Sequence, residues 1–429
     1  LLNSISSDSL ESLEEYNNIL SQESNVAILS QIEFEIRMKI TMRSQFNSVF
    51  SLAKKSGFII DQSDYQLKIL PTNHDIRIEM ENLTTIQEYC NTNQLPEDCR
   101  FTKKIFLTSH GGLYTNRDFM FNIAIQKENP FTETNPTVQS LKNSLSQREK
   151  LYRYLHRTSL IHKRFPNIRI DMSEVRSMKT KDRFVKHKKM KIQYEVEIEL
   201  INMERNFDIQ YIVTQLKNVI KMIMRSIQNT SYPQPFHVLT EAKDQYFNLC
   251  NRQYKNPDLH TRYPIFIGPS SLTLQKENLC IPKDNGVHVS VLNHFCVTDK
   301  ADGERKLLYI NPSGHLYFID SNLHFQYTGV TILKSSGLSL NHTIIDGEYL
   351  TMDKNGNMIN LFAAFDIYIC SNKDFRFFPF VNDEVVTECR YTKLKEVIGL
   401  LNNKDNLQYK SEQNRLEFSA KHFECTSDS

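Results

Sequence analysis

Two segments far apart in the chain alternate between apolar and polar residues. In residues 31–37 and 194–200 every second residue is apolar, and almost all of the residues between are charged. A period of two places alternate side chains on opposite faces of a β-strand. We therefore predict two strands, each with one apolar and one charged face. The charged faces carry Glu33, Glu35 and Arg37 in the first strand and Glu195, Glu197 and Glu199 in the second.

Three further segments, residues 75–80, 152–159 and 168–173, carry basic residues on the polar face of a predicted strand. Each alone would fit an antiparallel sheet with its polar side in water. Together, acidic strands at both ends of a region and basic strands between them favour a closed barrel. Its lumen would be charged and its apolar faces would pack outward against helices. The basic lumen residues would be Arg37, Arg77, Arg153, Arg157 and Arg169.

Three glutamates in succession on one strand face repel one another. A divalent cation would relieve this repulsion, because hard cations prefer carboxylate oxygens as ligands. The acidic strands therefore predict a metal site, and the arginines would hold a polyphosphate beside it.

The rest of the chain alternates helices with more apolar strands. Residues 208–228 repeat apolar positions with helical periodicity, and we expect a second helix at 238–249. Residues 307–310 and 316–319 read as two strands joined by a turn. Two later strands, 343–350 and 364–369, are apolar but contain Asp346, Glu348 and Asp366. Buried carboxylates are costly unless they are paired or bind a metal, so these strands indicate a site.

The segment from Lys300 to Arg305 reads Lys-Ala-Asp-Gly-Glu-Arg. A neutral lysine amine can attack phosphorus, and nearby cations or burial favour that neutral form. Gly303 would let the backbone turn close to a phosphate, and Asp302 would orient the lysine. Asp-Gly is also a common turn signal, so Lys-Ala-Asp-Gly alone would fit an ordinary turn. The carboxylate-bearing strands that follow it favour a covalent nucleotidyl-transfer site.

Composition narrows the possibilities only slightly. The chain has 429 residues, which is enough for two or three domains, and a net charge of only +2, so any nucleic-acid-binding surface must be local. Its eight cysteines show no zinc-ligand spacing, and we expect reduced thiols. No apolar run approaches transmembrane length, so no membrane is expected.

The segment around Lys300 and the two apolar strands at 343–350 and 364–369 resemble the covalent nucleotidyltransferases. This superfamily includes the mRNA guanylyltransferases and the ATP-dependent polynucleotide ligases. These segments look closest to the mRNA-capping enzymes of large cytoplasmic DNA viruses. The resemblance implies that Lys300 attacks the α-phosphorus of GTP and holds GMP as a phosphoramide. It also implies nucleotide or metal contacts for Asp302, Gly303, Arg305, Glu348, Phe365 and Asp366.

The two glutamate-rich strands resemble those of the triphosphate tunnel metalloenzymes, specifically the RNA triphosphatases of viral and fungal capping systems. Glu33 and Glu35 match the first Glu-x-Glu strand of that family, and Glu197 and Glu199 match the last, which Glu195 extends. The resemblance implies Mg²⁺ or Mn²⁺ on the glutamates and an RNA 5′-triphosphate on the arginines.

These resemblances predict an α+β chain in four parts. They are an N-terminal helical segment at 1–24, a tunnel barrel at 25–228, a helical linker at 229–262 and a nucleotidyltransferase domain at 263–429. The nucleotidyltransferase family has two later strand motifs and an OB-fold that we do not find, so we expect this domain to be incomplete and a poor guanylyltransferase.

The expected partners are the 5′ end of nascent RNA and GTP, with a cap methyltransferase as a further partner or domain. If the chain is viral, the resemblance implies the host cytoplasm or the virion. Two alternatives stay open: an ATP-dependent polynucleotide ligase, and a non-catalytic RNA-binding subunit.

Overall fold

The computed structural model describes residues 2–108, 113–179, 191–251, 266–280, 290–292, 295–337, 339–381, 388–413 and 415–425. The segment from Arg176 to Lys191 is rich in lysine and arginine, and most of it lies outside the described residues. The chain divides into two compact units, Leu1–Asn229 and Thr230–Ser429.

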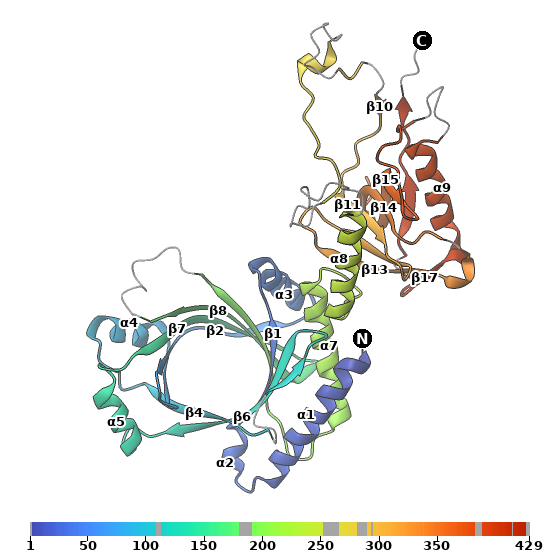
Figure 1. The fold of residues 1–429 in the computed structure, drawn as a ribbon. Coiled ribbons are helices and arrows are strands. Elements are labelled where there is room, and N and C mark those ends of the chain that lie inside the picture. The colour runs from blue at the N-terminus through green and yellow to red at the C-terminus, as the bar shows by residue number, and fades with distance from the viewer. Residues whose placement is uncertain are drawn as a thin grey trace. The chain divides into compact units, whose positions relative to one another are not determined.

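In the first unit, eight antiparallel strands of the described residues close into a barrel (Figure 1). The order is β1-β9-β8-β7-β2-β3-β4-β6, and pairing of β6 with β1 closes the ring. The predicted barrel is confirmed. Its strands are β1 (Ile32–Lys39), β2 (Ile59–Pro71), β3 (Arg77–Glu81), β4 (Arg100–Phe106), β6 (Phe121–Phe131), β7 (Lys150–His162), β8 (Phe165–Met178) and β9 (Gln193–Leu200), with the short β5 (Tyr114–Asn116) added beside β6.

Helices cover the outside of the barrel because the apolar faces of the strands point outward. One core joins β1, β6, β8 and β9 to α1 (Leu2–Gln22), α3 (Arg43–Lys55) and α7 (Ile209–Ile227). A second core joins β2, β3, β4 and β7 to α4 (Leu83–Thr92) and α5 (Pro136–Ser144). The short α2 (Val26–Leu29) precedes β1. The helix predicted at 208–228 is confirmed as α7, whose first turn is capped by the Asp208 carboxylate accepting the Tyr211 N–H at 3.1 Å.

The second unit is built on a mixed eight-stranded sheet. Its path is β16-β15-β14-β11-β12-β13-β17, and β18 pairs with β15 in parallel. The strands are β11 (Glu304–Ile310), β12 (His315–Ile319), β13 (Phe325–Ile332), β14 (Thr343–Met352), β15 (Met358–Cys370), β16 (Lys373–Asp374), β17 (Leu407–Tyr409) and β18 (Glu417–Ala420). A separate pair is formed by β10 (Cys296–Val297) and β19 (Glu424–Cys425).

Two helices cover opposite faces of this sheet (Figure 1). On one face, α8 (Phe236–Asn251) packs Tyr246 against Leu307 and Tyr309 of β11. On the other, α9 (Arg390–Asn402) packs against Leu308 and Phe362. Single 3-10 turns form at Lys276–Leu279, Lys334–Ser336 and Lys404–Asn406. Residues 229–262, expected to link the domains, thus contribute α8 to the core of this unit as far as they are described.

The prediction that the cysteines are reduced thiols is wrong at Cys296. Cys296 is disulfide-bonded, and the backbone pairing of β10 with β19 places Cys425 opposite it. Six cysteines of the described residues are free thiols. Within the described residues, no helix has the length and apolarity needed to cross a membrane.

Candidate active sites

The first candidate site is the lumen of the barrel, where strands from the two ends of the unit become neighbours. The pairing of β1 with β9 sets Glu35 opposite Glu199 and Arg37 opposite Glu197. On the other side of β9, strand β8 sets Arg169 opposite Glu199. Because alternate residues of a strand share a face, this register turns Arg169 of β8 and the alternating charged residues of β1 and β9 into the lumen.

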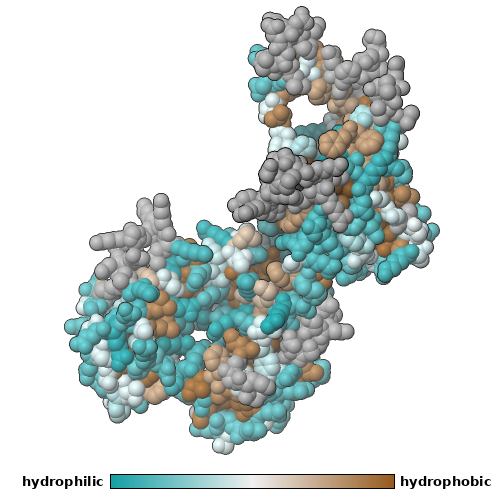
Figure 2. Space-filling view, in the orientation of Figure 1, coloured by the Kyte–Doolittle hydropathy of each residue, from teal (hydrophilic) through white to brown (hydrophobic). Residues whose placement is uncertain are grey.

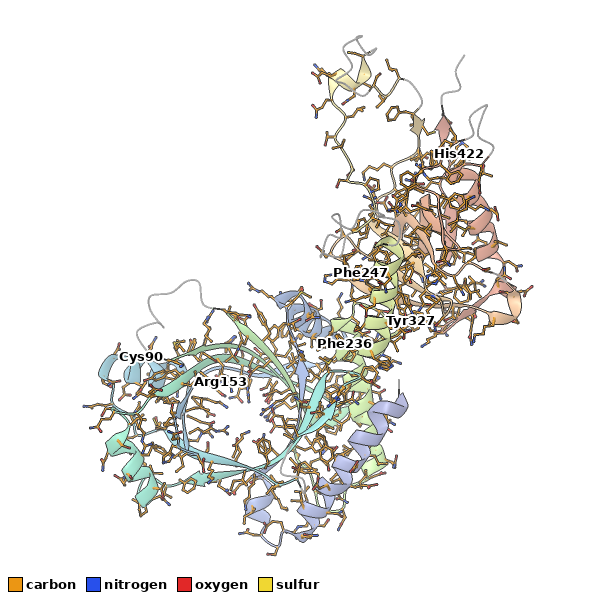
Figure 3. All side chains as sticks on the ribbon, viewed as in Figure 1. Cys90, Arg153, Phe236, Phe247, Tyr327 and His422 are labelled. Carbon is orange, nitrogen blue, oxygen red and sulfur yellow. The ribbon has the colours of Figure 1, made fainter. Side chains whose placement is uncertain are left out.

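The lumen contains a cavity of about 160 Å³. Figure 3 shows side chains of the barrel strands pointing into it, Arg153 among them, and Figure 2 shows a largely hydrophilic surface on the visible face of the barrel unit. Eight glutamates and eight lysines or arginines line the cavity, so its formal charge is balanced. All ten residues predicted to face the lumen are among them: Glu33, Glu35, Glu195, Glu197, Glu199, Arg37, Arg77, Arg153, Arg157 and Arg169.

Ion pairs connect the lumen side chains around the ring. Arg37 lies 2.5 Å from Glu35 and 3.3 Å from Glu197, and Arg157 reaches Glu197 at 3.1 Å. Arg153 contacts Glu195 at 2.6 Å. Glu35, Glu195 and Glu197 therefore each have an arginine partner.

Sequence reasoning missed several lumen residues. Asp171 is 1% exposed and accepts hydrogen bonds from Arg157 and Arg169, at 3.3 and 2.9 Å. It shares its strand face with Arg169, so the alternation of β8 could have found it. Lys68 gave no such signal, because the apolar Leu70 lies on the same side of β2. The alternation also did not show which carboxylates pair with Lys68 and Lys104, because these partners come from other strands. These pairs are Lys68 with Glu79 at 3.5 Å, and Lys104 with Glu33 at 2.7 Å and with Glu128 at 2.8 Å.

Crowding of carboxylates changes their protonation. Burial raises the pKa of Glu197, and the neighbouring Glu35 carboxylate raises it further. Burial also opposes ionisation of Glu35, but hydrogen bonds from Arg37 and from Glu197 lower its pKa overall. The two glutamates thus share a proton, with the negative charge on Glu35. Burial, with the nearby Glu33 and Asp171 carboxylates, raises the pKa of Glu199 to about 7.

The donor chemistry of the lumen suits a hard divalent cation. Glu35 and Glu197 share a proton, and a cation could replace that proton with carboxylate oxygens as ligands. Within the described residues, however, no three His, Cys, Asp or Glu side chains are grouped closely enough to hold a metal. The lumen carboxylates instead form ion pairs with arginines and lysines. Metal binding would require these pairs to rearrange.

The second candidate site surrounds Lys300, just before β11. The Lys300 amine contacts Asp302 at 2.5 Å, and both side chains are exposed, by 85% and 91%. The hydrogen bond from Lys300 and its charge lower the pKa of Asp302, and the same contact raises the pKa of Lys300. In this arrangement the amine is protonated at neutral pH and cannot act as a nucleophile.

Gly303 brings the backbone against β14. Its N–H donates to the Glu348 carboxylate at 3.0 Å. A Cβ at this position would lie 2.6 Å from the Tyr349 carbonyl oxygen. Only glycine therefore allows this close approach, which ties the Lys300 loop to Glu348.

The two aspartates in the apolar strands are paired with arginines. Asp346 is fully buried and accepts two hydrogen bonds from Arg305, at 3.1 Å to Nε and 2.5 Å to Nη2. Asp366 accepts from Arg390 of α9 at 2.8 Å. The ring of Phe365 lies 5.9 Å from the Arg305 guanidinium. The structure thus brings Arg305, Asp346 and Phe365 together, while Asp366 is held by an arginine that the sequence did not indicate.

Parts of this chain are similar to known proteins. Residues 243–429 match the family model described as mRNA capping enzyme, catalytic domain. A curated relative, the probable mRNA-capping enzyme of Acanthamoeba polyphaga mimivirus, is 28% identical over 227 residues, which are 53% of this chain and 16% of the relative. Over these residues the chain is similar to mRNA-capping enzymes. It spans about a sixth of the length of this capping-enzyme relative.

Solved structures of RNA triphosphatases also match part of this chain. One is the RNA triphosphatase domain of a trifunctional mimivirus mRNA capping enzyme, with 20% identity and a TM-score of 0.37, covering 50% of this chain and 96% of that one. Another is the Pct1 RNA triphosphatase of S. pombe, with 12% identity and a TM-score of 0.29, covering 51% of this chain and 90% of that one.

Proposed function

We propose that the chain is part of an mRNA 5′-capping enzyme with two activities. The barrel unit removes the γ-phosphate from 5′-triphosphate RNA. The second unit forms a covalent GMP adduct on Lys300 and passes GMP to the resulting diphosphate end. The observation that carries the proposal is the closed, charge-balanced lumen, in which glutamates of β1 and β9 face each other beside arginines of β7 and β8.

In the barrel, Mg²⁺ or Mn²⁺ held by Glu35, Glu197 and their neighbours would polarise the γ-phosphoryl group. The arginines that now contact these glutamates would be released toward the phosphate oxygens. Arg157 and Arg169 are held by the buried Asp171, so they stay oriented when a glutamate partner is lost. Positioned cations stabilise the charge that develops on the phosphoryl oxygens. Water attacks the γ-phosphorus, the bond to the bridging oxygen breaks, and inorganic phosphate leaves.

In the second unit, the Lys300 amine must first lose its proton. It then attacks the α-phosphorus of GTP, a P–N bond forms, and pyrophosphate leaves. The terminal phosphate oxygen of the diphosphate RNA next attacks the same phosphorus and frees the lysine. Arg305, fixed by Asp346, is placed to contact the nucleotide, and Glu348 fixes the loop through Gly303.

A pair of assays on this chain tests the proposal. The first measures release of labelled phosphate from RNA carrying a ³²P γ-phosphate. The second incubates the chain with α-labelled GTP or ATP and maps any covalent adduct. Labelling by ATP alone would favour the ligase alternative, and absence of both activities would favour a non-catalytic RNA-binding subunit. An adduct on a lysine other than Lys300 would show that the nucleophile is wrongly assigned.

Several features belong to the proposal by family resemblance alone. They are the choice of Mg²⁺ or Mn²⁺, the nucleotide contacts of Phe365 and Asp366, a cap methyltransferase as partner, and a location in the host cytoplasm or the virion.

A further inference from the structure

The Arg305 side chain is enclosed by a segment that precedes the Lys300 motif by about thirty residues. Besides its two bonds to Asp346, the guanidinium donates from Nη1 to the carbonyl oxygen of Pro269 at 2.6 Å. These bonds use three of its five N–H groups. The side chain is 33% exposed, so it still faces solvent on one side and can present N–H groups to a ligand.

Two aromatic rings flank the same guanidinium. Phe266 lies 5.5 Å from it and Phe365 lies 5.9 Å from it. Phe365 comes from β15, whereas Phe266 comes from the segment before the Lys300 motif. A cation near two ring faces is attracted to both, so the rings limit how far the guanidinium can swing.

Gly268 leaves room for this arrangement. A Cβ built on Gly268 would lie 2.6 Å from Arg305 Nη2, 2.6 Å from a ring carbon of Phe266 and 3.2 Å from an oxygen of Asp346. The first two distances are far inside van der Waals contact. Any side chain at position 268 would therefore push Arg305 away from its buried carboxylate or displace the Phe266 ring.

We infer that residues 266–269 are part of the nucleotide site, and that Gly268 and Pro269 are positioning residues for Arg305. The inference rests on the proposed guanylyltransferase function, because it assigns Arg305 a ligand, the phosphate or ribose oxygens of a nucleoside triphosphate. A guanidinium held before the ligand arrives loses little freedom on binding. The segment thus acts through Arg305 and does not replace it.

The test substitutes Gly268→Ala in the complete 429-residue chain. A matched control is Gly399→Ala in α9, where an added Cβ meets no atom within 4 Å. The first measurement is the affinity for a fluorescent GTP analogue with Mg²⁺. We expect Gly268→Ala to bind at least about tenfold more weakly, and Gly399→Ala to bind like the parent. Phe266→Leu, which removes the ring without a clash, should lose about threefold.

The second measurement needs no nucleotide. Phenylglyoxal modifies accessible guanidinium groups, and peptide mass spectrometry reports the rate at Arg305. Gly268→Ala should raise that rate severalfold, and Gly399→Ala should leave it unchanged. Phosphate release by the barrel unit should be the same in all variants, which shows that the substitutions leave the barrel unit intact.

The two possible failures are distinguishable. If Arg305 reacts at the parental rate in Gly268→Ala and nucleotide affinity is unchanged, the inference is overturned. If the parent chain does not bind the GTP analogue, the proposed nucleotide site of the second unit is overturned, whatever the reactivity of Arg305.

Discussion

The two candidate sites differ most in how much water reaches their charged groups. In the barrel, the side chains of Glu35 and Glu197 are 7% and 13% exposed, and each contacts an arginine. At the second site, Lys300 and Asp302 are 85% and 91% exposed and contact only each other within the described residues. The barrel therefore offers a site with its charges already desolvated and oriented. The lysine site has a rigid part, the Arg305–Asp346 pair, and a nucleophile that is still hydrated.

This difference sets what each site needs before it can react. The cavity in the lumen is lined by equal numbers of acidic and basic residues, and the buried Asp171 adds a further carboxylate, so a triphosphate entering it brings excess negative charge. A divalent cation would restore the balance and free arginines for the phosphate. The lysine site instead lacks a neutral amine, because the Asp302 carboxylate stabilises the protonated form of Lys300. The barrel site thus needs to bind a cation before it can react, and the lysine site needs to lose a proton.

The largest expected effect comes from removing one lumen glutamate. Glu35→Ala or Glu197→Ala should lower phosphate release from triphosphate RNA at least about 100-fold, because a metal ligand and an arginine partner are lost together. Release of labelled γ-phosphate measures the effect. Glu174→Ala is the matched control, since Glu174 lies on β8 opposite Tyr194, on the outer face of the barrel. Parental activity in a folded Glu35→Ala, Glu197→Ala double variant would contradict the tunnel function.

Metal affinity should depend on pH, because protons and cations compete for the same carboxylates. Glu199, with a pKa raised to about 7, and Glu197, whose pKa burial also raises, hold protons at pH 6 and lose them as the pH rises toward 8. We expect Mn²⁺ affinity to rise about tenfold or more across this interval. Titration calorimetry at pH 7 in two buffers of different ionisation enthalpy should show proton release on binding. Affinity that is flat between pH 6 and 8 would mean that these glutamates do not hold the metal.

The lysine site should show the opposite limitation, with reactivity set by its own amine. The Asp302 contact raises the pKa of Lys300, so the neutral amine is scarce at pH 7 and increases about tenfold for each pH unit below that pKa. Acylation of Lys300 by a trace of acetic anhydride, followed by mass spectrometry, measures this without any nucleotide. Asp302→Asn should shift the profile to lower pH. An unshifted profile would show that the contact between the two side chains does not persist in solution.

The alternation of apolar and charged residues predicted much of the barrel, because period two directly fixes which side chains share a face. It identified β1, β9 and the lumen-facing arginines. It could not identify Lys104 as the partner of Glu33, because β6 lies between β4 and β1 in the sheet and the contact spans it. Lys68 was also missed, because the apolar Leu70 occupies the same lumen-facing side of β2 and breaks the polar pattern.

The second site was less predictable for a similar reason. Asp346 and Asp366 were recognised as costly carboxylates in apolar strands, but their arginine partners come from different parts of the fold. Arg305 is in the neighbouring strand β11, while Arg390 begins α9, more than twenty residues after Asp366. The contact of Gly268 with Arg305 had no local signal, since it depends on how the segment folds over the sheet.

The smallest effect tests whether the lysine site has a rigid part at all. Tyr368 donates its hydroxyl to the buried Asp346 carboxylate, which in turn holds Arg305. Tyr368→Phe should destabilise the second unit by about 1.5 kcal/mol, because a buried charged acceptor loses a donor. The matched control is Tyr309→Phe on β11, since the buried Tyr309 hydroxyl has no hydrogen-bond partner among the described residues. Its removal should cost nothing or stabilise slightly. Hydrogen exchange of the sheet amides, measured during urea unfolding, reports the stability of the second unit separately from that of the barrel. The exchange protection of the barrel amides should not change. Equal losses of stability in the two variants would mean that the hydrogen bond from the Tyr368 hydroxyl to Asp346 adds no stability of its own. The contrast between a rigid arginine and a hydrated lysine would then lose its basis.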